Sequence, residues 1–402
     1  MERRIEGSLL FFMLFILPFQ NEIEILPGFS LVWGIFGLVG LYCLFVIPDR
    51  LNKNLFHPLL LIFYPLVAWA FLIETFSDHR SYSECFQILQ MLVGAGLITT
   101  LMSAGHHQRV ALYGLIAGGV YLSALLLSQA YQVLLGASVA NAYGASAVRV
   151  EVFRDLQMNA NLNEMAFYLA ISSMSCLVLA LDKASAWQAR LLAYLCLVFC
   201  ALGALMPMSR GGAIVLIVSL LAVVRGYRKS FGGIVVVGGV LVGIIALLIP
   251  QVVLTRLTAT NTEYQGKEDS RMVLVQNFFN EFSEFWWRGV GTNNYWEAWG
   301  HQHGFVFKEG FTVGTHNALF QAWVYWGFVG AILFVGSYFI FLKSIAFLER
   351  GTLEASFVKS LSVSLVVLLA VTHILFAKEI SIILGLGIGL METVKRTESA
   401  IA

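Results

Sequence analysis

The stretch "GTHNALFQAWVYWGFVG" spans residues 314–330 and gives the first indication of how the chain folds. It opens with a histidine and an asparagine and then becomes a long apolar segment, which predicts a membrane helix with an ionisable side chain at its mouth. Ionisable residues at membrane helices usually have a function, because charge is costly there. His316 is therefore a helix cap, a packing residue or a catalyst, and other parts of the sequence must distinguish these roles.

The composition of the whole chain agrees with a membrane location. Its 402 residues are 58% hydrophobic and 12% charged, whereas a soluble domain carries about 25% charged residues. The net charge of +1 says little about partners, and no nucleic-acid partner is expected. The N-terminal stretch "MERRIEGSLLFFMLFILPF" lacks a small-residue cleavage site, so we expect an uncleaved first helix. The cysteines show no metal-like spacing and are expected to act as small hydrophobes: Cys43, Cys85, Cys176, Cys196 and Cys200.

Apolar segments of the required length, roughly 20 residues, recur along the chain. They predict an all-α polytopic membrane protein with about twelve transmembrane helices, centred near residues 14, 38, 65, 95, 120, 171, 196, 217, 241, 328, 363 and 386, the first and eighth of them short. One outer loop is sizeable. The expected division is residues 1–251 for helices one to nine, residues 252–314 for this loop, and residues 315–402 for helices ten to twelve.

The basic residues orient these spans. With both termini inside the cell, the inner segments hold 15 of the 25 lysines and arginines, in agreement with the positive-inside rule. The outer side holds the other ten basic residues, and seven of these are arginine: Arg80, Arg149, Arg154, Arg210, Arg256, Lys267, Arg271, Arg288, Lys308 and Lys378. Translocated loops follow the rule weakly, which is one explanation. An anion bound at the outer face is the other.

Polar clusters fall at the outer starts of three predicted helices. "MPMSRGG" places Ser209 as an N-cap and Arg210 directly after it. "GTHNALF" places His316 at the start of the tenth helix. "NANLNEMA" places Asn161, Asn163 and Glu164 at the start of the sixth helix. Helix N-termini carry free N–H groups and partial positive charge, so all three starts suit anions.

The long outer loop offers a fourth helix start. "KEDSRMVLVQNFFNEFSEFWW" has the spacing of an amphipathic helix lying on the outer leaflet. A cap at Asp269 or Ser270 leaves Arg271 in the first turn, where its fork can grip two oxygens of a pyrophosphate. Simpler explanations stay open, because Arg210 can snorkel to the interface and Arg271 can pair with Glu268.

In their order and sidedness these motifs resemble the O-antigen ligase and polymerase superfamily. The resemblance rests on "SRGG", "GVGTNNY", "HNALFQAWVYWGFVGAILF" and "NLNEMA", the last with Leu162 where proline is common, and it covers about residues 149–340. Chain size favours the O-antigen ligase (WaaL) family. The resemblance implies a GT-C-like enzyme of the Gram-negative inner membrane with a periplasmic active site. Its expected partners are an undecaprenyl-pyrophosphate-linked glycan donor, a lipid A–core acceptor and membrane lipids.

The resemblance also implies a mechanism without cofactor or metal. His316 is the expected general base, and Arg210 and Arg271 are expected to bind the pyrophosphate as the glycan is transferred with inversion. No Asp-x-Asp occurs, and the nearest carboxylate pair is Glu22 and Glu24. Further substrate-binding candidates are Arg149, Arg154, Asn161, Asn163, Arg288 and Asn317.

Other functions stay open at this stage. An O-antigen polymerase or a protein O-oligosaccharyltransferase of the same superfamily would share the motifs. A twelve-helix transporter or flippase is the alternative of a different class. Transporters place their ionisable residues near the bilayer midplane, whereas here the polar residues gather at predicted outer helix starts, which favours an enzyme.

Overall fold

The computed structural model describes most of the chain. The residues outside its description are 1, 20–23, 27–28, 104–106, 138–144, 146–147, 150, 154–161, 227–238, 240–242, 244–246, 259–269, 307–311, 347, 349–352, 373–374, 376–377 and 402. The elements of the described part are helices apart from one short antiparallel hairpin, in which Glu24 pairs with Ser30 and Leu26 with Phe29, and one isolated β-bridge between Val306 and Thr312. The all-α expectation is therefore confirmed except for this hairpin and this bridge.

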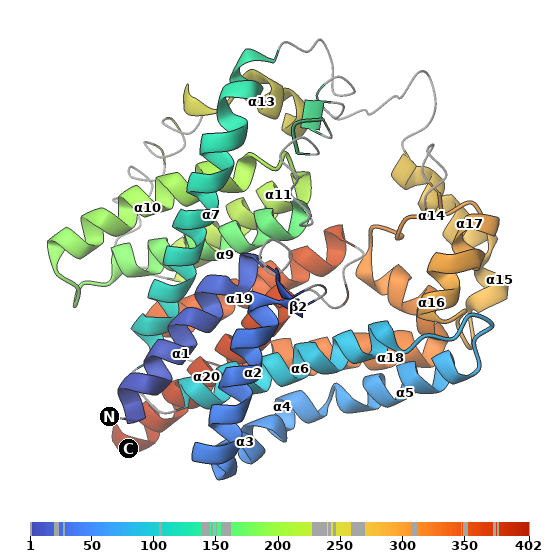
Figure 1. Ribbon diagram of the computed structural model, residues 1–402, viewed down its shortest axis with the longest axis horizontal. Coiled ribbons are helices and arrows are strands. Elements are labelled where there is room, and N and C mark those ends of the chain that lie inside the picture. Colours follow the sequence, from blue (N-terminus) through green and yellow to red (C-terminus); the bar gives the residue numbers. More distant parts are fainter. Residues whose placement is uncertain are drawn as a thin grey trace.

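The first half of the chain forms helices and the hairpin in this order: α1 (Glu2–Ile16), η1 (Leu17–Phe19), β1 (Glu24–Leu26), β2 (Phe29–Ser30), α2 (Leu31–Val46), α3 (Pro48–Leu55), α4 (Pro58–Leu61), α5 (Tyr64–Thr75), α6 (Ser83–Met102), α7 (Gln108–Gly136), α9 (Leu162–Leu181), α10 (Trp187–Leu205) and α11 (Arg210–Gly226). The second half continues with α13 (Gln251–Thr258), α14 (Ser270–Asn280), α15 (Phe282–Phe285), α16 (Thr292–Asn294), η3 (Tyr295–Trp299), α17 (Gly300–Gln302), α18 (Ala318–Ala346), α19 (Leu353–Val371) and α20 (Lys378–Ile401). Figure 1 shows this order along the chain.

Helices occupy eleven of the twelve predicted span centres, and the remaining one, near residue 241, lies outside the described residues. Among the described helices, seven are long and apolar enough to cross a membrane, or up to eight if the bent pair of residues 34–46 and 48–55 forms one span. The expected count of about twelve is thus not confirmed. The helices at the first and eighth centres are short, as predicted, with 15 residues in α1 and 17 in α11.

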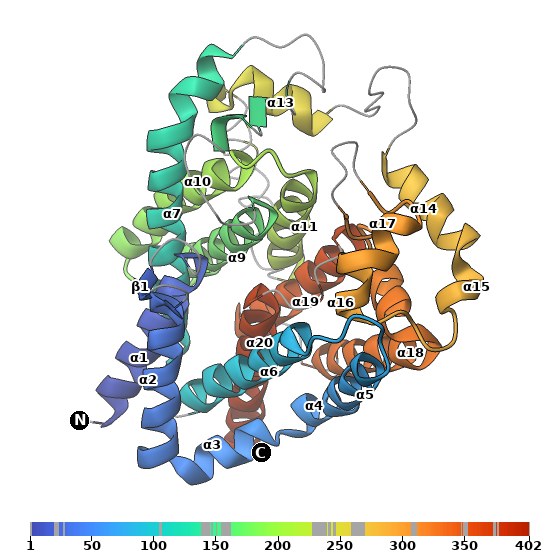
Figure 2. The same cartoon turned by 45° about the vertical axis from the view of Figure 1, so that its right-hand side comes forward.

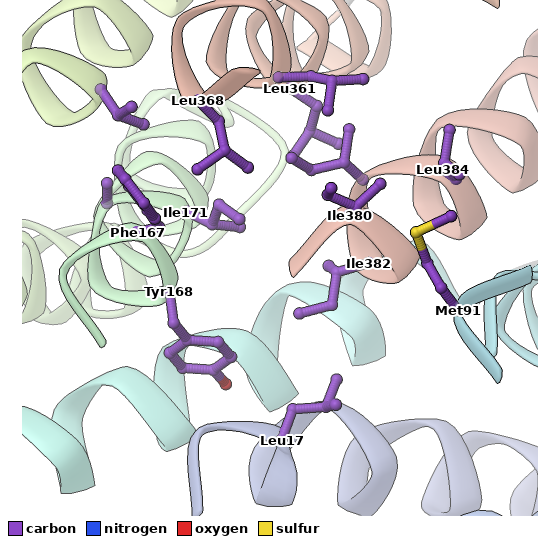
Figure 3. Packing of buried hydrophobic residues seen from close by; sticks show 14 of the residues in the cluster. Leu17, Met91, Phe167, Tyr168, Ile171, Leu361, Leu368, Ile380, Ile382 and Leu384 are labelled. Carbon is purple, nitrogen blue, oxygen red and sulfur yellow. The ribbon is translucent and has the colours of Figure 1, made fainter. Parts of the chain in front are cut away.

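Helix α9 lies at the centre of the packing. It is buried continuously from Met165 to Leu181 and contacts α7, α10, α11 and α19. Small residues permit the close approach of neighbouring helices, because a side chain at Gly118 would clash with Tyr168 and one at Gly119 with Ser172. The Tyr168 hydroxyl donates to the Leu14 carbonyl at 2.7 Å. Figure 3 shows this tyrosine among buried apolar side chains of several helices.

Helix α18 is broken at Gly327, where φ is 65° and ψ is −164°. The expected continuous helix after His316 is therefore wrong, because residues 318–326 and 328–346 form two helical segments. The backbone groups freed at the break find partners in residues 286–290. Phe328 N–H donates to the Trp286 carbonyl at 2.8 Å, and Val290 N–H donates to the Val324 carbonyl at 2.9 Å. Such replacement bonds are what allow a helix to break inside an apolar protein.

Glycines make this junction possible. Gly289 and Gly291 have φ of 79° and 85°, a region that glycine adopts without steric cost. A side chain at Gly289 would clash with the backbone of residues 325–327, and one at Gly327 would clash with the Trp287 carbonyl. The run "WWRGVG" therefore serves to seat the loop backbone against the break.

The amphipathic helix of the outer loop packs on protein as well as exposing aromatic residues. Phe278 of α14 is 2% exposed and stacks on Phe320 of α18 with ring centroids 4.3 Å apart. Phe282 of α15 contacts Trp323 edge-on, with ring centroids 5.4 Å apart. The expectation that this whole apolar face lies on the outer leaflet is corrected by these contacts. The exposed aromatic side chains that remain are Phe279, Trp286 and Trp287.

Candidate functional site

The start of α11 is capped as the sequence predicts. The Ser209 hydroxyl accepts from Gly212 N–H at 3.1 Å, and its carbonyl accepts from Ala213 N–H at 2.9 Å. Arg210 is the first helical residue. Gly212 is required because a side chain there would clash with Ala166 of α9. The motif "SRGG" thus combines a cap, a cation and two small residues that admit a neighbouring helix.

The start of α18 is capped by Asn317. Its side-chain oxygen accepts from Leu319 N–H at 3.0 Å and from Phe320 N–H at 3.1 Å. Its carbonyl accepts from Gln321 N–H at 2.9 Å. Asn317 is therefore the N-cap of α18, and the capping role considered for His316 is wrong. Asn317 was expected to bind substrate, and the capping bonds give it a structural role as well.

His316 has an unusual backbone. Its φ is 56°, and among the described residues only one other non-glycine residue, Met208 with φ of 54°, lies in this region. Each of the two directly precedes a cap, His316 before Asn317 and Met208 before Ser209. Conformations of this kind cost about 1–3 kcal/mol and cluster at functional sites. The His316 side chain is half-buried, so it is accessible.

Both helix starts meet the last residues of α19. The Asn317 side-chain amide donates to the Ala370 carbonyl at 3.4 Å. A side chain at Gly211 would come within 3.0 Å of Val371. Helices α11 and α19 pack side by side, and Figure 2 shows α19 next to α11. His316 and Arg210 are thus brought to the same end of the helical bundle, although they are far apart in the sequence.

Arg149 ties the start of α9 to the same region. Its Nε donates to the Pro207 carbonyl at 2.7 Å, just before the α11 cap, and its terminal nitrogen donates to the Asn163 side chain at 3.4 Å. Burial lowers the pKa of Arg149 to about 10, so the side chain remains cationic at neutral pH. Asn161 and Arg154, the other candidates near this start, lie outside the described residues.

Arg256 is a neighbour of Arg210 that lies outside the sequence motifs. The Arg210 Nε donates to the Arg256 carbonyl at 3.1 Å, which joins α13 to the start of α11. The Arg256 side chain is half-buried. The contact brings the Arg256 backbone to the Arg210 guanidinium, which lies next to a helix N-terminus, an arrangement of the kind that binds phosphate groups. The excess of arginine among the predicted outer residues was the only sequence signal for this pairing.

The two remaining arginine candidates lie between α13 and α18 in the sequence. Arg271 is in the first turn of α14, as predicted, but its side chain is outside the description. Arg288 is exposed and flanks the junction at Gly327 rather than a helix start. Of the residues proposed for the site, the structure therefore gathers Arg149, Asn163, Arg210, His316 and Asn317 around the ends of α9, α11, α18 and α19.

Within the part of the chain that the structure describes, no group of three or more histidine, cysteine or acidic residues is arranged to hold a metal. Glu22 lies outside this part, and so do Glu268 and Asp269.

Comparison with known families agrees with the motifs. Residues 195–335 match the family model described as O-Antigen ligase. The match supports the O-antigen ligase/polymerase superfamily and, with it, a glycosyltransferase-like enzyme embedded in a membrane. It runs from within α10 to within α18, so it contains both capped helix starts and the junction at Gly327. No curated protein matches the chain.

Proposed function

We propose that the chain is an O-antigen ligase. It transfers a glycan from undecaprenyl pyrophosphate to a sugar hydroxyl of lipid A–core, at the periplasmic face of the inner membrane. The observation that carries this proposal is the meeting of two capped helix starts at the end of α19, one with Arg210 and one with His316. The matched O-antigen ligase family supports the chemistry assigned to them.

The α11 start receives the leaving group. Polyprenyl pyrophosphate is a stable anion, so it needs charge compensation more than it needs a proton. Arg210 supplies a guanidinium fork, and the N–H groups of the first turn of α11 add partial positive charge. Arg271 is the second pyrophosphate ligand in the proposal, brought from the first turn of α14. Arg149, Arg154 and Arg288 are assigned to the phosphates or the acceptor core, with Asn161 and Asn163 nearby.

The α18 start activates the acceptor. A sugar hydroxyl has a pKa far above neutral, so a base assists its attack. His316 takes the hydroxyl proton onto its imidazole while the acceptor oxygen forms the bond to the anomeric carbon. The bond from that carbon to the pyrophosphate oxygen breaks, and undecaprenyl pyrophosphate leaves with the electron pair. A single displacement of this kind inverts the anomeric centre. No step requires a metal.

A gene deletion in a smooth Gram-negative host tests the assignment. Lipopolysaccharide is separated on a gel, and lipid-linked glycan is measured in parallel. A ligase predicts polymerised O-antigen accumulating on its lipid carrier and lipopolysaccharide without O-antigen. Lipopolysaccharide capped with a single repeat would identify a polymerase instead. Normal lipopolysaccharide with loss of protein glycosylation would identify a protein O-oligosaccharyltransferase.

Reconstituted vesicles separate these enzymes from a transporter or flippase. The purified protein is supplied with donor and acceptor on the same side of the membrane. An enzyme forms the new glycosidic bond there, whereas a flippase moves the lipid-linked glycan across the membrane without forming any bond.

A further inference from the structure

Gln321 is a polar side chain with no exposure to solvent. It lies one turn into α18, four residues after the Asn317 cap, and is 0% exposed. A glutamine in such a place normally serves a specific hydrogen bond, because an unsatisfied buried amide is costly. It cannot touch a substrate directly while fully enclosed, so its effect on the site must pass through another residue.

Gln321 forms a hydrogen bond with the residue directly before His316. Its side-chain oxygen accepts from Thr315 N–H at 2.6 Å. Thr315 is itself 3% exposed, and its hydroxyl donates to the Asn317 carbonyl at 2.9 Å. The residues on both sides of His316 are therefore fixed, Thr315 by the Gln321 side chain and Asn317 by its capping bonds. This double restraint holds His316 in its left-handed conformation, which an unrestrained chain would leave.

The segment before His316 is held from the same buried region. The Tyr295 hydroxyl donates to the Val313 carbonyl at 2.5 Å, and Val313 N–H donates to the Phe305 carbonyl at 2.8 Å. Burial raises the pKa of Tyr295, with a smaller opposing effect from the Gln321 amide next to its hydroxyl, so Tyr295 remains a neutral donor. Tyr295 and Gln321 thus both hold the segment that leads to His316, Tyr295 at the Val313 carbonyl and Gln321 at the Thr315 N–H.

We propose that Gln321 is the positioning residue for His316. By accepting the Thr315 N–H it sets the backbone, and so the direction, from which the imidazole reaches the acceptor hydroxyl. This inference rests on the proposed function, in which His316 is the general base. A base displaced by about 1 Å loses roughly a hundredfold in rate, so a single buried bond next to His316 has a measurable effect.

The first test compares three variants of the full-length purified protein. Gln321→Met keeps the length of the side chain and removes the acceptor, whereas Gln321→Glu keeps a side-chain oxygen in place. Gln276→Met makes the same chemical change at an exposed position of α14 and serves as the control. We expect kcat to fall by roughly ten- to a hundredfold in Gln321→Met, with KM for donor and acceptor unchanged. Gln321→Glu should recover most of the rate, and the control should be normal.

The second test asks whether the effect passes through His316. His316→Gly removes the imidazole at a position where the backbone suits glycine. Added imidazole then supplies a base that no backbone positions. In the His316→Gly background, Gln321→Met should cause no further loss of transfer rate, either with added imidazole or without it. A merely structural role would instead lower the rate by the same factor in both backgrounds.

The outcomes separate the two proposals. Full activity in Gln321→Met, an altered donor KM, or a multiplicative loss in the His316→Gly background would overturn the positioning role alone. Full activity in His316→Gly without imidazole would overturn the base assigned under the proposed function. If Gln321→Met does not fold, Gln321→Glu becomes the deciding variant, and a folded Gln321→Glu protein with a large loss in kcat contradicts the proposal.

Discussion

The start of α11 and the start of α18 share one backbone design and differ in the side chain placed before the cap. Met208 and His316 both have left-handed φ, and each is followed by a side-chain cap. Met208 is 0% exposed and fills the core, whereas His316 is half-buried and accessible. The first start therefore offers a fixed cation next to its cap, in Arg210, and the second offers a group that can accept a proton. The shared backbone fixes where the helix begins, and the side chain decides what that start can do.

Glycine substitution at the two left-handed positions should break this comparison most clearly. His316→Gly should lower glycan transfer by about 10²–10⁴-fold, while thermal unfolding in detergent changes by no more than about 1 kcal/mol, because relief of strain is offset by the more flexible unfolded chain. Met208→Gly should instead destabilise the protein by about 2–5 kcal/mol through loss of a buried side chain. Equal losses of stability at both positions would contradict the division of roles.

Lysine in place of arginine tests the cationic side of the comparison. Arg210→Lys and Arg271→Lys keep the charge but lose the planar fork. Each should cost about 1.5–3 kcal/mol per charged hydrogen bond removed, or roughly ten- to a hundredfold, and the loss should appear in donor dependence more than in acceptor dependence. Transfer is measured at varied donor concentration with protein levels matched. Near-normal rates in both variants would mean that these arginines only anchor the protein at the interface.

The cap residues give a smaller contrast. Ser209→Ala and Asn317→Ala should each destabilise the protein by about 1 kcal/mol. Asn317→Ala should also lower kcat, roughly tenfold, because it frees the residue after His316, whereas Ser209→Ala frees no base. Unfolding and transfer rate are measured on the same preparations. A kcat loss in Ser209→Ala as large as that in Asn317→Ala would show that capping alone is responsible.

Chelator should have the smallest effect of all. The proposed mechanism uses arginines and helix starts for charge compensation, so transfer in excess chelator should equal transfer without it. Activity that is lost in chelator and regained with Mg²⁺ or Mn²⁺ would redirect attention to Glu22, Glu24 or the Glu268–Asp269 pair.

Local rules predicted the α11 start well and the α18 start less well. Ser209 could be recognised as a cap because a serine followed by a helix former caps through bonds to its own next residues. At α18 the choice among Thr315, His316 and Asn317 depends on the left-handed conformation of His316 and on a bond from Thr315 N–H to the Gln321 side chain, six residues further on. The pattern of residue types carries no information about that conformation.

Long-range contacts account for the other misses. The break at Gly327 depends on the backbone of residues 286–291, which the chain brings to α18 from the outer loop. Without that partner, an apolar run through Gly327 is indistinguishable from one continuous span. The contact of Arg210 with Arg256 likewise joins residues 46 positions apart. Hydropathy placed the helices, whereas the site is built from bonds between them.

Labelling at position 316 tests the central claim most directly, that the two helix starts form one outward-facing site. The His316→Cys variant is prepared in a cysteine-free background and treated in spheroplasts with a thiol reagent that does not cross the membrane. We predict rapid labelling of Cys at this position from outside, and slower labelling when undecaprenyl pyrophosphate is added. In the double variant His316→Cys, Arg210→Ala, undecaprenyl pyrophosphate should no longer slow the labelling. Labelling only after the membrane is opened, or an equal rate with and without undecaprenyl pyrophosphate, would contradict the account.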